Sequence, residues 1–207
     1  IYTTSNTLSL HDALPISTGD IWLFRGRKVN DRWVQVTTNS PVNHVAMAVA
    51  IGDLPPLLWH TESSPSANDV WTGTRHAGVQ LQRLDESVRV WSERWDQQPY
   101  VRQLSPAVGP DAEDELLRVI NEYSGRRFPS ARGLAKRWLL GRVRRSAFPD
   151  EIFCAELIAT TYQRMGLLDQ TKPPNWYDPG RFWSGDRILL GDGFSLSQET
   201  AVDVRVS

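Results

Sequence analysis

The sequence predicts a single domain of the α+β class, in which most of the strands come first along the chain and the helices follow. Up to about residue 104, apolar and polar residues alternate with the period of two that is typical of strands. After residue 105 the apolar residues recur at helical spacing, and the chain shows no internal repeat and no low-complexity linker. Strands and helices segregated in this way favour an antiparallel sheet or small barrel packed against helices.

The expected strands cover residues 20–24, 32–37, 42–51, 57–62, 78–84 and 99–104, with short strands near 187–190 and 201–206 completing the sheet. The run over 42–51 is apolar almost throughout, which is typical of a central strand covered on both faces. Helices are expected over 111–123, 131–144 and 153–165. Asp111 can cap the first of these helices, and Gly166 follows the last at the usual stop position.

The first residues stand apart from this pattern. Residues 9–16 read Ser-Leu-His-Asp-Ala-Leu-Pro-Ile, the translation of TCC-CTA-CAC-GAC-GCT-CTT-CCG-ATC, which resembles part of a common sequencing adapter. We therefore interpret residues 1–17 as an adapter-derived segment and residues 18–207 as one folded domain, the alternative being a genuine N-terminal arm. His11 and Asp12 are excluded from any candidate site for this reason.

Composition narrows the possible functions. The formal charge of −1 argues against a globally basic nucleic-acid binder, and no run approaches the ~18 consecutive apolar residues of a membrane-spanning helix. The single cysteine excludes an intrachain disulfide and a multi-cysteine zinc cluster, and the scattered histidines lack the spacing of metal ligands. We therefore expect neither a metal nor another cofactor. Nine tryptophans indicate a well-filled core or an aromatic-lined groove.

Two residues carry the strongest chemical signal. Cys154 falls at the predicted start of a helix, where free N–H groups and the helix dipole favour a thiolate. The alternative is a buried, inert thiol. His44 is an ionisable residue within an otherwise apolar strand, so its imidazole is either a hydrogen-bonded core residue or a catalytic base.

A third residue is needed to orient a catalytic base. Glu62 ends the next predicted strand, and pairing of the two strands would let its carboxylate meet the far nitrogen of His44. The alternative is a solvated carboxylate at a strand end. His60 lies two residues before Glu62, so both side chains can share one face of the sheet, whereas His76 falls in a polar loop.

Five short motifs follow one another along the chain: Gly19-Asp20-Ile21, Asn43-His44-Val45, Thr61-Glu62-Ser63, Gly78-Val79 and Phe153-Cys154-Ala155-Glu156-Leu157-Ile158. In this set the chain resembles the circularly permuted papain-like cysteine hydrolases of the YiiX type. These are relatives of NlpC-type peptidases and of lecithin:retinol acyltransferase-like enzymes. The resemblance covers residues 19–183, and the histidine precedes the cysteine as permutation requires. Ala155 departs from the pattern, since the family often has serine there.

The resemblance implies a permuted papain-like fold with Cys154 as nucleophile, His44 as general base and Glu62 as orienting residue. It also implies substrate contacts from Trp176 and Tyr177, because residues 174–182 resemble the proline-containing stretch that follows the family's cysteine helix. Asn43, in the Asn43-His44-Val45 motif, is the third expected substrate contact. The backbone N–H of Cys154 is the expected oxyanion donor. An acyl-enzyme would pass its acyl group to water or to another acceptor.

One basic segment stands out against the nearly balanced total charge. No acidic residue lies between Tyr123 and Pro149, and the basic residues there are Arg126, Arg127, Arg132, Lys136, Arg137, Arg142, Arg144 and Arg145. A basic amphipathic helix can lie on an anionic membrane surface or hold another acidic partner, here through Lys136, Arg137, Arg142, Arg144 and Arg145. The alternative is a solvated helix whose arginines pair with acidic residues elsewhere. No nucleic-acid-binding module accompanies the segment.

The sequence therefore predicts a cysteine-dependent amidase, peptidase or acyl hydrolase acting on a peptide, acyl-amide or lipid substrate. The alternative is a catalytically silent papain-like module that binds an anionic lipid or other acidic partner through residues 126–145. Localisation stays open, because a single free cysteine suits the cytosol and equally a periplasmic or secreted enzyme whose leader has been lost.

Overall fold

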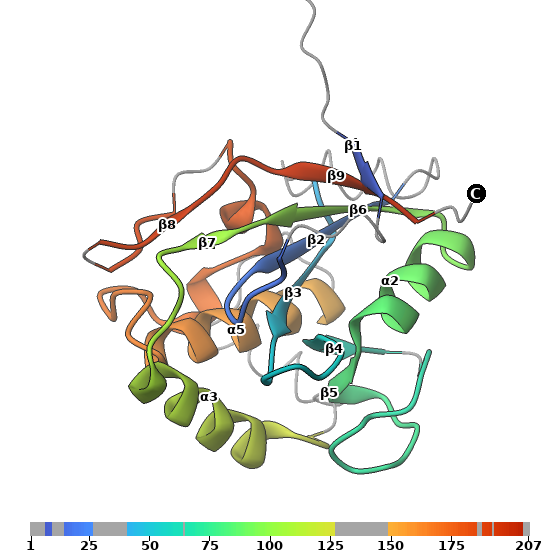
Figure 1. Cartoon of the computed structure of the whole chain (residues 1–207), viewed down its shortest axis with the longest axis horizontal. Coiled ribbons are helices and arrows are strands. Elements are labelled where there is room, and N and C mark those ends of the chain that lie inside the picture. Colours follow the sequence, from blue (N-terminus) through green and yellow to red (C-terminus); the bar gives the residue numbers. More distant parts are fainter. Residues whose placement is uncertain are drawn as a thin grey trace, which may run out of the picture.

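The computed structural model describes residues 7–9, 15–26, 41–63, 65–126, 149–185, 188–191 and 193–204, with backbone alone for 7–9 and 149–153 (Figure 1). The predicted strand over 32–37 and the predicted helix over 131–144 lie outside these residues. The same holds for Lys136, Arg137, Arg142, Arg144 and Arg145 of the predicted anionic-partner patch.

The described strands form a seven-stranded sheet in the order β1-β9-β6-β2-β3-β4-β5. Their bounds are Thr7–Ser9 (β1), Ile21–Gly26 (β2), His44–Val49 (β3), Leu57–Glu62 (β4), Gly78–Arg83 (β5), Gln97–Arg102 (β6) and Thr200–Asp203 (β9). Only the β1–β9 pair among them is parallel. A second sheet pairs β7 (Leu104–Ser105) with β8 (Ser195–Leu196). The predicted α+β class and mostly antiparallel sheet are confirmed.

The helices are α2 (Leu84–Glu93), α3 (Pro110–Tyr123) and α5 (Pro149–Arg164), with short 3-10 turns η1 (Pro174–Trp176) and η2 (Pro179–Phe182). Helix α3 lies where the sequence predicts it, and α5 begins four residues earlier than expected. Helix α2 was not predicted. The strand expected near 187–190 is wrong, because among the described residues there Leu190 makes a single bridge to Leu168 and the residues beside it are irregular.

Strand β1 belongs to the segment interpreted as adapter-derived. Its three residues pair with β9 at the edge of the sheet, from Thr7 opposite Ala201 to Ser9 opposite Asp203. An edge position can be filled by any short extended segment, since it needs backbone hydrogen bonds and no particular side chains. The proposed boundary at residue 18 therefore stays a prediction.

The sheet separates two apolar clusters, and β3 contributes to both through the alternation of its side chains. Val45, Met47 and Val49 face α5 and belong to the larger cluster. Ala46 and Ala48 face α2 and belong to the smaller one. Figure 1 shows α2 and α5 on opposite sides of the sheet. This arrangement gives each strand residue a defined face, which decides which side chains can meet.

Asp20 of the Gly19-Asp20-Ile21 motif has a structural role. Its carboxylate is fully buried and accepts hydrogen bonds from the backbone N–H groups of Ser17 and Leu104, both at 2.8 Å. Burial raises the pKa of this carboxyl, and the two backbone hydrogen bonds act against that rise. Asp20 thus ties the entry of β2 to β7.

Arg102 at the end of β6 joins three segments that are distant in sequence. Its guanidinium is buried and donates to the carbonyl oxygens of Ser197 at 2.6 Å, Phe182 at 2.7 Å and Leu196 at 3.2 Å. Burial lowers the pKa of Arg102, and the nearby Glu199 charge opposes that effect. The side chain therefore acts as a clamp between η2, β8 and the main sheet.

We expect Arg102→Met to lower the free energy of unfolding by about 3 kcal/mol, because it leaves these buried carbonyl groups without their donor. Chemical denaturation followed by circular dichroism measures this change. Arg89→Met, at an exposed position of α2, is the matched control and should change the free energy by less than about 0.5 kcal/mol. Equal effects of the two substitutions would contradict the clamp.

Candidate active site

Cys154 lies in the second turn of α5, on the face that covers β3 and β4. Its side chain is fully buried in the larger apolar cluster, together with Val45 and Met47. The prediction that Cys154 begins its helix is wrong, because α5 starts at Pro149 and the unpaired N–H groups of a helix belong to its first four residues. The expected oxyanion role of the Cys154 N–H has no support from this position.

Helix α5 is anchored to the sheet one and a half to two turns beyond the cysteine. The indole Nε1 of Trp59 on β4 donates to Thr161 Oγ1 at 3.1 Å, and both residues are buried. Thr161 Oγ1 in turn donates to the carbonyl oxygen of Leu157 at 2.8 Å. The anchor fixes the helix, and with it Cys154, over the centre of the sheet.

His44 is the first residue of β3 and points to the other side of the sheet. Its ring stacks on Trp91 of α2, with centroids 4.1 Å apart and an interplanar angle of 24°, and also contacts Phe24. Trp91 and Phe24 belong to the α2-side cluster, whereas Cys154 belongs to the α5-side cluster. The structure therefore does not bring the predicted nucleophile and base together, and their pairing stays a prediction.

His60 is the immediate partner of His44. His60 Nδ1 lies 3.4 Å from His44 Nε2, and His60 Nε2 lies 3.1 Å from Gln82 Oε1 and 3.8 Å from Glu62 Oε1. The expected sharing of one face by His60 and Glu62 is confirmed. The expected direct contact of Glu62 with His44 is replaced by a chain in which His60 stands between them.

The hydrogen bonds of Gln82 assign the protons of this chain. Its amide Nε2 donates to Gln80 Oε1 at 2.6 Å, so its Oε1 is the acceptor that faces His60. His60 must then carry its proton on Nε2, which leaves Nδ1 as the acceptor for a proton on His44 Nε2. In this arrangement the basic nitrogen of the neutral His44 ring is Nδ1.

Glu62 is the last side chain of this hydrogen-bonded series, and it is buried. Ser66 Oγ donates to its Oε1 at 2.5 Å, while its Oε2 is buried with no hydrogen-bond partner among the described residues. Ser87 Oγ donates to Gln82 Oε1 at 2.8 Å and completes the polar cluster, which we name the histidine cluster: His44, His60, Glu62, Ser66, Gln80, Gln82 and Ser87. All of its side chains are buried.

Burial shifts the titration of these groups. Desolvation lowers the pKa of His44 well below its usual value, and the neighbouring His60 lowers it further. Desolvation also lowers the pKa of His60 to about 4, against the hydrogen bond to Gln82. It raises the pKa of Glu62 to about 7, against hydrogen bonds from Ser66 and Gln82. Both imidazoles are therefore neutral at neutral pH, and burial disfavours their charged form.

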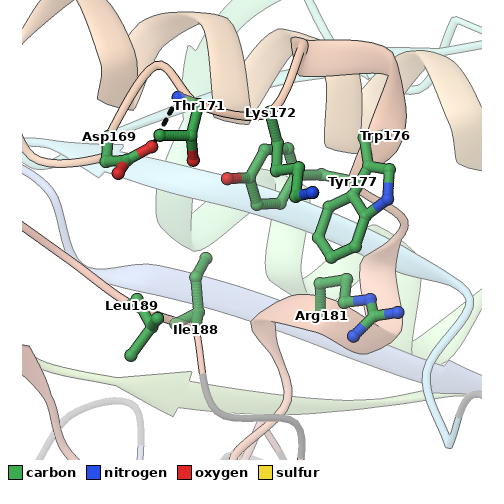
Figure 2. Close-up of a pocket in the computed structure, with 8 residues that line it drawn as sticks. All are labelled: Asp169, Thr171, Lys172, Trp176, Tyr177, Arg181, Ile188 and Leu189. Carbon is green, nitrogen blue, oxygen red and sulfur yellow. Dashed lines mark hydrogen bonds between the residues drawn. The ribbon is translucent and has the colours of Figure 1, made fainter.

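Trp176 and Tyr177, two of the predicted substrate-binding residues, line a pocket of about 160 Å³ on the α5 side of the sheet (Figure 2). The sequence did not single out the charged residues of this pocket, which are Asp169, Lys172 and Arg181. Asn43 is not among the residues that line it. Asn43 donates its backbone N–H to Phe24 at 3.0 Å, and its Oδ1 is buried without a partner in the described part of the chain.

Two further expectations concern metals and membranes. Within the described ranges, histidine, cysteine and acidic side chains form no group of three or more that could hold a metal ion. Where helices are described, none is long and apolar enough to cross a membrane.

Fold and site together define an α+β protein with a helix-borne buried cysteine on one face of the sheet and a buried histidine–carboxylate chain on the other. No protein-family model matches the chain, and no curated protein matches it in sequence. It is similar in structure to a crystal structure described as metalloprotein yiiX from Escherichia coli O157:H7, with 17% sequence identity and a TM-score of 0.47. That similarity covers 91% of this chain and 89% of the other. Residue roles in this chain therefore rest on its own geometry.

Proposed function

We propose that this protein is a cysteine-dependent acyl hydrolase of the permuted papain-like class. The proposal rests mainly on the chain of titratable groups from His44 through His60 to Glu62, because buried groups with shifted pKa values gather at catalytic sites. A second support is the order of the sequence motifs, in which the histidine strand precedes the cysteine helix. The substrate class is an amide, ester or thioester of a peptide or acyl group.

In the proposed reaction, His44 Nδ1 takes the proton of the Cys154 thiol and the thiolate bonds to the carbonyl carbon. The bond to the leaving amine, alcohol or thiol breaks, and the leaving group takes the proton from the imidazolium. Water then loses a proton to Nδ1 and attacks the thioester, which releases the carboxylic acid and restores the thiol. In the resting protein His60 accepts the Nε2 proton of His44, which leaves Nδ1 as the basic nitrogen.

This reaction requires a conformational step. Cys154 is fully buried on the α5 side, whereas the His44 ring stacks on Trp91 on the α2 side. Val45 follows His44 in β3 and belongs to the same apolar cluster as Cys154. We propose that substrate binding opens this cluster and turns the His44 ring toward α5, as lid and loop movements do in other enzymes.

The second candidate is the catalytically silent module, which the placement of Cys154 and His44 on opposite faces favours. Its binding surface would be residues 126–145, of which the structure describes Arg126. The Arg126 guanidinium lies 4.3 Å from the centroid of the Tyr123 ring and 3.5 Å from Glu122. Arg126 is thus paired within its own helix region, and the proposed surface would depend on the residues that follow it.

A substrate screen separates the two candidates. Peptide, acyl-amide and thioester substrates are tested with the wild-type protein and with Cys154→Ala, His44→Ala and His76→Ala variants. We expect Cys154→Ala to reduce kcat/KM by about 10⁴-fold or more and His44→Ala by about 10²-fold or more. His76→Ala is the matched control, since its ring lies in the loop before β5 and should leave turnover unchanged.

The pH dependence of thiol labelling gives an independent readout. A nucleophile assisted by His44 should be alkylated with an apparent pKa below the ~8.5 of free cysteine, and His44→Ala should remove that advantage. Turnover that survives in Cys154→Ala would falsify the hydrolase proposal. Labelling near the free value, unaltered by His44→Ala and without turnover, would establish the silent module instead.

A further inference from the structure

The pocket of Figure 2 is built by one continuous stretch of chain and a facing wall. The stretch runs from Asp169, just after α5, through η1 to Arg181 in η2. The wall is formed by Ile188 and Leu189, next to the Leu168–Leu190 bridge. Its volume is about 160 Å³. This pocket has room for a small ligand.

Positive charge gathers at the tryptophan end of the pocket. The Arg181 guanidinium carbon lies 4.4 Å and the Lys172 Nζ 5.6 Å from the centroid of the Trp176 ring. Contact with the ring face orients both cations. Figure 2 shows the Trp176 ring beside both side chains, with the aliphatic wall on the facing side of the pocket.

Negative charge marks the other end. Asp169 Oδ1 accepts the backbone N–H of Thr171 at 2.5 Å, and hydrogen bonds from Thr171 lower the pKa of this carboxyl. Charges at both ends of the pocket act on Tyr177. Burial and the Asp169 charge raise the pKa of its hydroxyl, and the Arg181 charge lowers it. The pocket is therefore polarised along its length.

We propose that this pocket binds a small carboxylate that carries a short aliphatic tail. Arg181 and Lys172 would hold the carboxylate, as charge-assisted donors do. Asp169 repels a carboxylate from the opposite end and so sets its direction. Ile188 and Leu189 cover the tail. This binding does not depend on the reaction proposed for Cys154, although a hydrolase of acyl groups releases a product of this class.

The test is a calorimetric titration of the full chain and of its Cys154→Ala variant with 4-methylpentanoate. Three analogues with similar tails replace the carboxylate by a neutral amide, a phosphate or an ammonium group: 4-methylpentanamide, 3-methylbutyl phosphate and 4-methylpentylamine. We expect the carboxylate to bind with equal affinity to both proteins and at least about tenfold more tightly than the amide or the ammonium compound.

Variants locate the binding site. Lys172→Gln and Arg181→Gln should each weaken 4-methylpentanoate binding by about tenfold. The matched control is Arg164→Gln, on α5, where the arginine pairs with Glu115 and Glu122 at 3.3 and 3.2 Å. Asp169→Asn should strengthen binding by about twofold to threefold, because it removes a repulsion of partly screened charges.

The outcomes are decisive in either direction. Equal affinity for the amide and the carboxylate, or equal effects of Arg181→Gln and Arg164→Gln, would overturn the proposal. Tighter binding of the phosphate would overturn the assignment to carboxylates. If Arg181→Gln fails to fold, the exposed Lys172 and Asp169 still give variants with opposite expected effects on affinity.

Discussion

Glu62→Gln is expected to make the protein more sensitive to acid, and His60→Gln is expected to make it less sensitive. The pKa of Glu62 is raised by burial from 4.5 to about 7, so between these pH values the folded chain keeps a proton that the unfolded chain loses. The pKa of His60 is lowered from 6.5 to about 4, so over that range the unfolded chain gains a proton that the folded chain does not. The two groups therefore give stability slopes of opposite sign.

A fall in pH from 6.5 to 4.5 changes the free energy of unfolding in opposite directions through the two groups. Over this window the Glu62 contribution to stability rises and the His60 contribution falls. Each changes by about 2 kcal/mol, because at 1.36 kcal/mol per pH unit the full proton difference applies over only part of the window. His44 acts in the same direction as His60, since burial also lowers its pKa. Relative to wild type, Glu62→Gln should lose about 2 kcal/mol more over the window, and His60→Gln about 2 kcal/mol less.

Urea unfolding at a series of pH values, followed by far-ultraviolet circular dichroism, measures these slopes. Glu113→Gln, an exposed substitution in α3, serves as control and should run parallel to wild type. Parallel curves for all three variants would show that the histidine cluster titrates in the folded state as freely as in the unfolded one. That result would also remove its support for the hydrolase proposal.

The strands were predictable because each needs only a local pattern. Residues 57–62 alternate between the two faces of the sheet, and the structure forms β4 over that range. The same alternation places His60 and Glu62 on one face, as expected from their separation by two residues. It could not show that His44 and Cys154 lie on opposite faces, because this depends on which side of the sheet α5 packs.

The sequence of helix α2 carries the pattern of an amphipathic helix. Leu84, Val88 and Trp91 have the spacing of one helix face, and Asp85 and Glu86 are acids in its first turn. Without this helix, the ring that stacks on His44 could not be predicted. The sequence alone therefore does not show which residue packs on the buried His44 ring. In the folded chain that residue is Trp91.

The charged residues of the pocket in Figure 2 could not be predicted from the sequence. Its aromatic residues were predicted from a resemblance, but Lys172 and Arg181 come together on Trp176 only because η1 and η2 turn the chain back twice. Charges brought together by two short turns leave no periodic pattern in a sequence. Their clustering emerges only from the folded chain.

Trp59→Ala is expected to lower the free energy of unfolding by about 4 kcal/mol, because the indole is fully buried and its removal leaves a cavity. It also removes the donor to Thr161 that anchors α5 on β4. The matched control is Trp71→Ala, since Trp71 is 46% exposed and its truncation should cost less than about 0.5 kcal/mol. A cost for Trp59→Ala no greater than that of the control would contradict the anchor.

The same variant tests what keeps the Cys154 thiol from reagents. If the thiol is reached only when α5 separates from the sheet, a loss of about 4 kcal/mol should speed its labelling by about 10³-fold, at 1.4 kcal/mol per factor of ten. Trp71→Ala should leave the labelling rate unchanged. A rate that stays at the wild-type value in Trp59→Ala would mean that the thiol is exposed by a smaller movement, one that leaves the contact between α5 and β4 intact. Such a movement is the kind that the proposed reaction requires, because it would open Cys154 without unfolding the helix that carries it.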